Sequence, residues 1–105
     1  MTADEVLDAL GNPTRRHILA LLRDAPRPVG ELAAALPISR PAVSRHLRVL
    51  ADAGLVTHES VGTSHVFSLR RAGFEAARGW LEAFWADALD RFATLAESTW
   101  DGAPR

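Results

Sequence analysis

The sequence predicts a mainly helical fold with one small β-hairpin, in the order α-α-α-α-β-β-α. Glycine and proline divide the 105 residues into short amphipathic stretches with helical spacing. Two short extended stretches, residues 55–59 and 65–69, flank a turn at Gly62. A long helical pattern then fills residues 72–99. Because the chain is short and lacks a linker, we expect a single domain over residues 1–105.

Start and stop signals set the boundaries of the first three helices. Residues 4–10 carry the spacing of a short amphipathic helix. Asn12 supplies an N-cap oxygen and Pro13 suits the first helical position, so a second helix begins there and stops before Pro26. A third helix of two turns is expected over residues 29–35.

A fourth helix, expected over residues 39–53, follows the third after a tight turn. Ser39 is its N-cap, and Pro41 is tolerated because the first amides of a helix have no intrahelical partner. Gly54 provides a left-handed stop. Two short helices joined in this way are typical of a helix-turn-helix, and the hairpin at residues 55–69 would be its wing. The expected fold class is therefore a winged helix-turn-helix.

The fourth helix has two chemically different faces. Val43, Leu47 and Leu50 cluster on one side, where they would pack. On the opposite side Arg45 can donate two hydrogen bonds to guanine, and its neighbours can reach thymine methyl groups and phosphates. The alternative is that this side is only a solvated helix face. His46 lies nearer the buried side and is expected to be structural. The expected DNA-binding residues of this helix are Ser39, Arg40, Pro41, Ala42, Ser44, Arg45 and Arg48.

Charge is unevenly distributed along the chain, although the net charge is only −1. Four Arg against five acids give −1 over residues 1–38, five against two give +3 over residues 39–71, and three against six give −3 over residues 72–105. The basic middle third is where a phosphate-facing surface would lie.

Three stretches together resemble the ArsR/SmtB family of bacterial repressors. They are ALGNPTRR at residues 9–16, ISRPAVSRHLRVL at residues 38–50 and AGLV at residues 53–56. The resemblance covers about residues 4–99. It implies a dimer whose terminal helices pair and whose recognition helices enter successive major grooves of a palindromic operator. It also implies wings that touch the flanking minor groove.

The wing departs from the pattern of the family. Relatives often have an arginine on each side of the wing glycine and a tyrosine in the returning strand, where this chain has Val61, Thr63 and Phe67. Contacts between the wing and phosphates should therefore be weaker. Thr63, Ser64 and His65 can still hydrogen-bond DNA, and the alternative is a plain solvated turn.

Metal, cofactor and enzyme functions find no support in the residues. In metal-sensing relatives a Glu-Leu-Cys-x-Cys motif supplies ligands, and its cysteines fall on Ala33 and Ala35 of a chain without any Cys. No histidine follows His65, which argues against the family's other metal site. We therefore expect no metal and no cofactor, as in the subgroup without metal ligands. The sequence has no Cys nucleophile, glycine-rich phosphate loop or Gly-x-Ser-x-Gly turn, so we expect no enzyme activity.

The beginning of the chain lacks the features of a secretory signal, and no apolar run is long enough to cross a membrane. We expect a cytoplasmic protein that does not enter a membrane.

The terminal helix carries more apolar surface than so small a core can absorb. Burying this stripe against a second copy would hide on the order of 1,000 Å² and give a permanent interface. We therefore expect a homodimer. Its expected interface consists of Leu7, Leu10, Leu81, Phe84, Trp85, Ala88, Phe92 and Leu95.

The expected function is a dimeric repressor that binds double-stranded DNA at an inverted repeat, and the promoter of its own gene is a candidate target. Two alternatives stay open. One is a winged helix used for protein association. The other is a repressor that responds to an unknown small molecule, held as an apolar ligand between Trp80, Phe84 or Trp85 and the helix-turn-helix.

Overall fold

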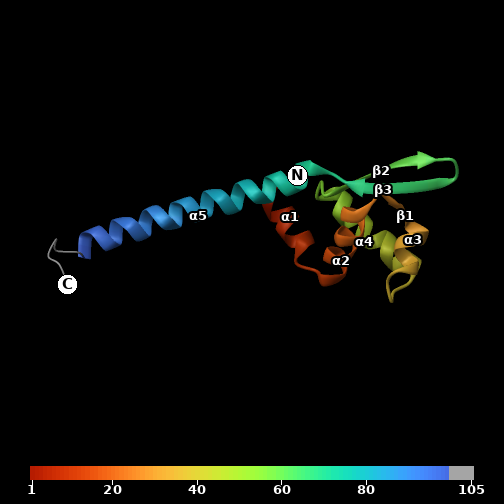
Figure 1. Ribbon diagram of the computed structural model, residues 1–105, viewed down its shortest axis with the longest axis horizontal. Coiled ribbons are helices and arrows are strands. Elements are labelled where there is room, and N and C mark those ends of the chain that lie inside the picture. The colour runs from red at the N-terminus through yellow and green to blue at the C-terminus, as the bar shows by residue number, and fades with distance from the viewer. Residues whose placement is uncertain (100–105) are drawn as a thin grey trace.

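The computed structural model describes residues 1–99, so the last six residues of the expected domain lie outside it. It confirms the expected order of elements and adds one short strand (Figure 1). The elements are α1 (Ala3–Leu10), α2 (Pro13–Asp24), β1 (Arg27–Pro28), α3 (Val29–Ala34), α4 (Arg40–Asp52), β2 (Val56–Val61), β3 (Ser64–Leu69) and α5 (Arg71–Thr99).

The expected caps form at both ends of α4 and at the start of α2. The Asn12 Oδ1 accepts a hydrogen bond from the Arg15 amide at 3.0 Å. The Ser39 Oγ accepts one from the Ala42 amide at 3.3 Å. Gly54 has a φ of 76°, the left-handed conformation that ends a helix without steric cost.

The two adjacent arginines after Asn12 join α1 to α2. The Arg15 Nε donates to the carbonyl of Ala9 at 2.7 Å, and the Arg16 Nη1 donates to that of Leu10 at 2.8 Å. The last carbonyls of a helix have no intrahelical partner, so these side chains satisfy groups that would otherwise need water. Both arginine side chains therefore have a structural role.

The sheet has three antiparallel strands in the order β1-β3-β2. The connection between β2 and β3 is only Gly62 and Thr63, which is tighter than the expected turn over residues 60–64. Gly62 permits this with a φ of 63°. The edge strand β1 was not expected, because two residues that include Pro28 carry no strand pattern.

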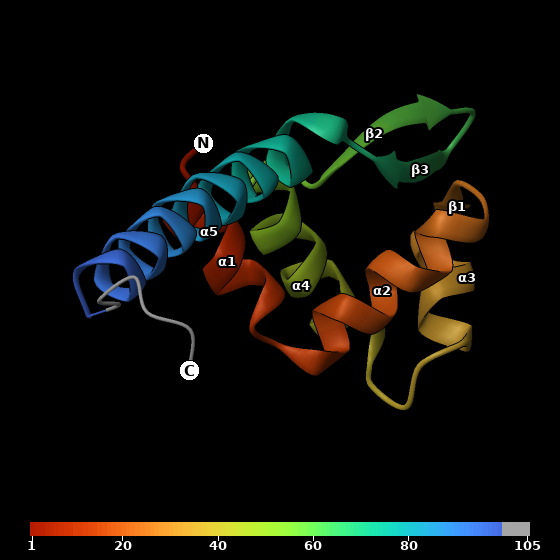
Figure 2. The ribbon, with the colours of Figure 1, turned by 60° about the vertical axis from the view of Figure 1, so that its left-hand side comes forward.

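The core lies between α4, the other short helices and the base of the wing. It includes Val43, Leu47 and Leu50 of α4, Ile18 of α2 and Leu32 of α3, each at most 1% exposed. Figure 2 shows α4 crossing the middle of the body, with α2 and α3 in front of and beside it. One face of α4 is therefore fixed by packing, which orients the opposite face.

Among residues 1–99, it is the beginning of α5 that packs against the other elements. Gly73 and Ala77 are buried, and the helix contacts α1. Beyond that contact α5 extends away from the body as a single helix (Figure 1). The chain accordingly measures 71 × 24 × 21 Å.

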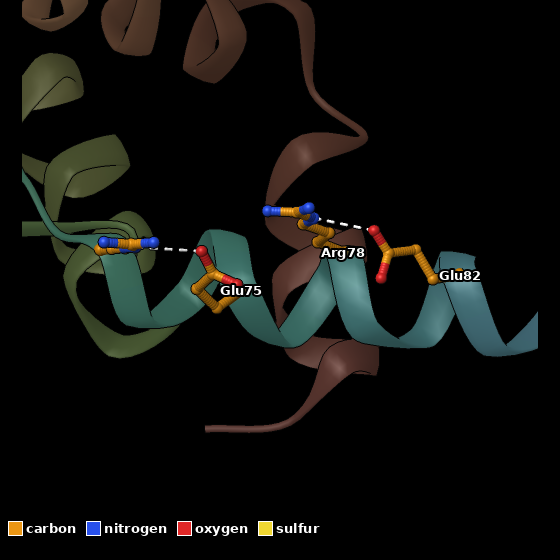
Figure 3. A network of polar contacts seen from close by, with 4 residues as sticks. Glu75, Arg78 and Glu82 are labelled. Atoms are coloured by element: carbon orange, nitrogen blue, oxygen red, sulfur yellow. Dashed lines mark hydrogen bonds and ion pairs between the residues drawn. The ribbon is translucent and has the colours of Figure 1, made fainter.

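The polar side of α5 is lined with ion pairs between residues four apart. They join Arg71 to Glu75 at 3.0 Å, Arg78 to Glu82 at 2.8 Å, and Arg91 to Asp87 at 3.0 Å (Figure 3 shows the first two). The hydrogen bond that Arg78 donates to the Glu82 carboxylate raises the pKa of Arg78 above its ordinary value. Such pairs support a solvent-exposed helix, so the polar side needs no other partner.

Within residues 1–99, no helix combines the length and the apolar character needed to cross a bilayer.

Candidate nucleic-acid interface

The outward face of α4 is exposed along the whole helix. Ser44, Arg45 and Arg48 are exposed, opposite the buried residues of the same helix. The helical spacing places Arg45 near the middle of this face and Arg48 on the side towards the wing. Pro41 is exposed in the first turn, and Ala42 is half-buried beside it.

Three arginines of α4 have no partner within the described part of the chain. Arg40, Arg45 and Arg48 form no ion pair and no side-chain hydrogen bond among residues 1–99. An unpaired guanidinium keeps all its donors for an external acceptor. This face therefore offers strong donors for phosphates or base edges.

The Ser39 hydroxyl has a structural task, because its oxygen accepts the first amide hydrogen bond of α4. Its hydrogen can still be donated to a second group. Ser39 is exposed, as is the adjacent Arg40. The positive end of the helix dipole is thus accessible to an anion at this position.

The wing lies beside the beginning of α4. Thr63, Ser64 and His65 line one hollow together with Arg40, and Glu31 of α3 shares its rim. The three wing residues are exposed. The structure thus brings the expected wing contacts and the first arginine of α4 to one surface.

A second hollow separates α4 from the flat face of the wing, and we call it the wing hollow. Its volume is about 350 Å³. Arg45 and the N-terminal residues of α4 lie outside it. Its lining residues are Val29, Ser44, Leu47, Arg48, Ala51, His58, His65 and Phe67.

The rings of His58, His65 and Phe67 form a cluster that sequence reasoning missed. The His58 ring lies 5.0 Å from the Phe67 ring and 5.3 Å from the His65 ring, between ring centres. His58 pairs with Phe67 across β2 and β3, while His65 pairs with Ser60. Alternation along paired strands puts all three rings on one face. The register of the hairpin was the only signal in the sequence that could have revealed this cluster. The expected turn over residues 60–64 was too long, so it gave the wrong pairs across the strands.

His46 is half-buried on α4 and adjoins the exposed face. Burial lowers its pKa below the ordinary value of 6.5, and the positive charges of Arg15 and Arg45 lower it further. At neutral pH the imidazole is therefore uncharged. The structural role expected for His46 stays a prediction.

The apolar stripe of α5 is exposed, and most of the expected dimer interface belongs to it. Leu81, Phe84, Trp85, Phe92 and Leu95 are each between 52% and 70% exposed. The other three expected residues, Leu7, Leu10 and Ala88, are half-buried.

Trp80 and Phe84 are neighbours on this helix. Their rings stack with centres 5.3 Å apart, and both side chains are exposed.

Within residues 1–99, no three His, Asp or Glu side chains lie close enough together to hold a metal ion.

The architecture defines a winged helix-turn-helix protein, and comparison with known proteins supports this class. A family model described as a helix-turn-helix domain matches residues 10–59. The exposed face of α4 described above lies within the matched segment.

The relatives define the family. The chain is 46% identical to the HTH-type transcriptional regulator Rv2034 of Mycobacterium tuberculosis, over 93% of this chain and 92% of that protein. It is 30% identical to the ArsR-like transcriptional regulator from Rhodococcus sp. RHA1, with a TM-score of 0.85 over 94% of this chain and 93% of that one. The chain belongs to the ArsR/SmtB family of transcriptional regulators. It is accordingly a DNA-binding regulator and not an enzyme.

A third relative bears on assembly. The homodimeric winged helix-turn-helix DNA-binding domain of Mb0332 from Mycobacterium bovis is 29% identical, with a TM-score of 0.63 over 84% of this chain and 82% of that one.

Proposed function

We propose that this protein is a homodimeric repressor that binds an inverted repeat and occludes a promoter, its own promoter being one candidate. The observation that carries the proposal is the exposed face of α4. It presents three arginines that have no ion pair or side-chain hydrogen bond within residues 1–99, on the second helix of a helix-turn-helix. In such a fold this helix is the one that enters the major groove.

The residues of α4 divide by the chemistry they offer to DNA. Arg45, in the middle of the face, donates two hydrogen bonds to guanine O6 and N7, and Ser44 adds a weaker base contact. Pro41 and Ala42 contact a thymine methyl group. Phosphates are bound by the residues at the two edges of the face, namely Ser39, Arg40 and Arg48.

The wing extends the same interface. Thr63, Ser64 and His65 share a hollow with Arg40, so a duplex that reaches one can reach the others. A hydroxyl offers a phosphate one hydrogen-bond donor, whereas a guanidinium offers five donors and a permanent positive charge. We therefore assign to the wing a smaller share of the affinity than to α4.

Dimerisation is assigned to α5 with help from α1. The exposed apolar stripe continues beyond the contact with α1, where no other element of residues 1–99 covers it. A second copy related by a two-fold axis would cover the stripe and place two α4 helices about one helical turn of DNA apart. The relative from Mycobacterium bovis is homodimeric, which supports the assembly of two copies.

Fluorescence anisotropy with a labelled duplex from the upstream region of the gene tests the proposal. We expect the logarithm of the binding constant to fall with the logarithm of salt concentration, with a slope of about −4. This corresponds to roughly four neutralised phosphates per dimer, namely those bound by Arg40 and Arg48 of each protomer. Affinity that ignores salt, or no affinity for any duplex, would instead favour a protein-association module.

A further inference from the structure

The wing hollow has a lining that the DNA-binding proposal does not fully use. Ser44, Leu47, Arg48 and Ala51 recur at intervals of three and four, so they form one side stripe of α4. The ring cluster of the wing faces this stripe, and Val29 of α3 closes one side. Residues of α3, α4, β2 and β3 therefore line the same space.

The lining of the wing hollow combines apolar walls with one positive charge. Leu47, Ala51, Val29 and Phe67 provide apolar walls. Arg48 provides a positive charge that has no acid partner within residues 1–99. No Asp or Glu belongs to the lining. The hollow thus favours a ligand with one negative charge and an apolar body, and disfavours a cation.

The aromatic cluster narrows the class of ligand. The His58 and Phe67 rings are tilted by 35°, whereas His65 meets His58 edge-on at 76°. Flat and edge-on ring surfaces of this kind pair well with another aromatic ring. A volume of about 350 Å³ is at the lower end of the usual range for small-molecule sites, which suits a compact ligand.

We propose that the wing hollow binds a small aromatic carboxylate, and that binding releases the protein from DNA. The carboxylate pairs with Arg48, and the ring lies against Phe67 and His58. Because Ser44 and Arg48 belong to the proposed DNA interface, ligand and duplex compete for them. This regulatory step rests on the proposed function, whereas the ligand site itself does not.

The test uses the full-length protein and the probe 2-naphthoate, with 2-naphthamide as its neutral analogue and acetate as an anion without a ring, all at constant ionic strength. In ¹H–¹⁵N spectra we expect 2-naphthoate to shift the resonances of Ser44, Arg48 and Phe67. The amide should bind at least tenfold more weakly, and acetate should have no effect. At saturation, 2-naphthoate should raise the Kd for the duplex at least tenfold.

Two variants outside the proposed DNA contacts locate the site. Ala51→Leu fills the hollow and should abolish the response to 2-naphthoate. Phe67→Leu keeps an apolar wall without a ring and should weaken probe binding several-fold. Ala20→Leu, the same enlargement in a hollow beside α2, is the matched control and should respond like the wild type. Phe67→Leu keeps the test decisive if Ala51→Leu does not fold.

Several outcomes would overturn the inference. One is that 2-naphthoate shifts no resonance of the hollow, even if the duplex does. Another is that 2-naphthoate and 2-naphthamide bind equally well. A normal response of folded Ala51→Leu would place the probe elsewhere. Binding in the hollow without loss of DNA affinity would refute the competition. A protein that binds 2-naphthoate but no duplex would instead contradict the proposed function.

Discussion

At the scale of single residues, the arginines of this chain serve two purposes that only the structure separates. Arg15 and Arg16 donate to the final carbonyls of α1, and Arg27 donates to the carbonyl of Leu21. These side chains hold elements together. The arginines of α4 have no such partners within residues 1–99, so their donors are available to a ligand. The candidate DNA-reading helix is therefore α4, because its arginines have free donors and not merely because it contains several arginines.

Replacing Arg45 should reduce both affinity and discrimination. Arg45→Ala removes a two-donor contact to one base pair, so we expect a loss of about 1–3 kcal/mol on the best duplex. The loss should shrink on duplexes altered at that base pair. Anisotropy titrations with a set of single-base-pair variants measure both effects.

Arg48→Ala is the matched control for Arg45→Ala, because both residues are exposed arginines of the same helix. We expect it to weaken all duplexes alike and to reduce the salt slope by about one unit per protomer, as loss of a phosphate contact requires. An Arg45→Ala protein that kept full affinity would show that another residue reads the base.

His46 should make stability depend on pH on the acid side of neutrality. Its pKa in the folded protein is below 6.5, so below pH 6.5 the unfolded chain binds more protons than the folded one. Stability is therefore complete above about pH 6.5 and falls as the pH drops towards the folded pKa. His46→Gln should lose less in Tm between pH 7.5 and 5.0 than the wild type. Equal losses would mean that other groups cause the acid sensitivity.

At the scale of elements, the sequence predicted the features that depend on neighbouring residues and missed those that depend on pairing between distant strands. The start of α4 was predictable because Ser39 acts on its own first turn, and its stop because Gly54 adopts a left-handed conformation. Strand β1 was not predictable, since it exists only through pairing with β3. The ring cluster was missed for the same reason. Its members come from two strands whose register depends on a two-residue turn.

The junction of α4 and α5 depends on a close backbone approach at Gly73. Its amide donates to the carbonyl of Gly54 at 2.8 Å, and an added Cβ would lie 2.6 Å from that oxygen. Gly73→Ala must therefore push the helices apart, at a cost of typically 1–3 kcal/mol for overpacking. We expect a lower urea midpoint at fixed protein concentration.

Gly79→Ala is the control on the same helix, because within residues 1–99 no atom beyond its chain neighbours and the adjacent helix backbone lies within 4 Å of its added Cβ. Alanine is the better helix former, so this variant should be stabilised by about 0.5–1 kcal/mol. If both glycine variants shifted the midpoint in the same direction, the close approach at Gly73 would not be what limits that position.

At the scale of the whole molecule, a single chain is far more extended than a compact domain of its size. Its radius of gyration is 19.9 Å, whereas a compact domain of 100 residues has about 13 Å. The excess comes from α5, whose 29 residues extend well beyond the body (Figures 1 and 2). The sequence predicted this imbalance, because the apolar pattern of the terminal helix was longer than the core.

Breaking the α5 stripe should separate the subunits without unfolding them. Phe92 is 70% exposed and lies far from the core, so Phe92→Glu removes little packing within the chain. In a dimer it would bury an unpaired charge, which is strongly unfavourable. Sedimentation should show monomers, and affinity for the full repeat should fall towards that for a half-site, since the second half-site no longer benefits from a high effective concentration. Ala86→Glu adds the same charge to the opposite, polar side of α5 and should stay dimeric. A Phe92→Glu protein that remained a dimer with full affinity would place the subunit contact elsewhere.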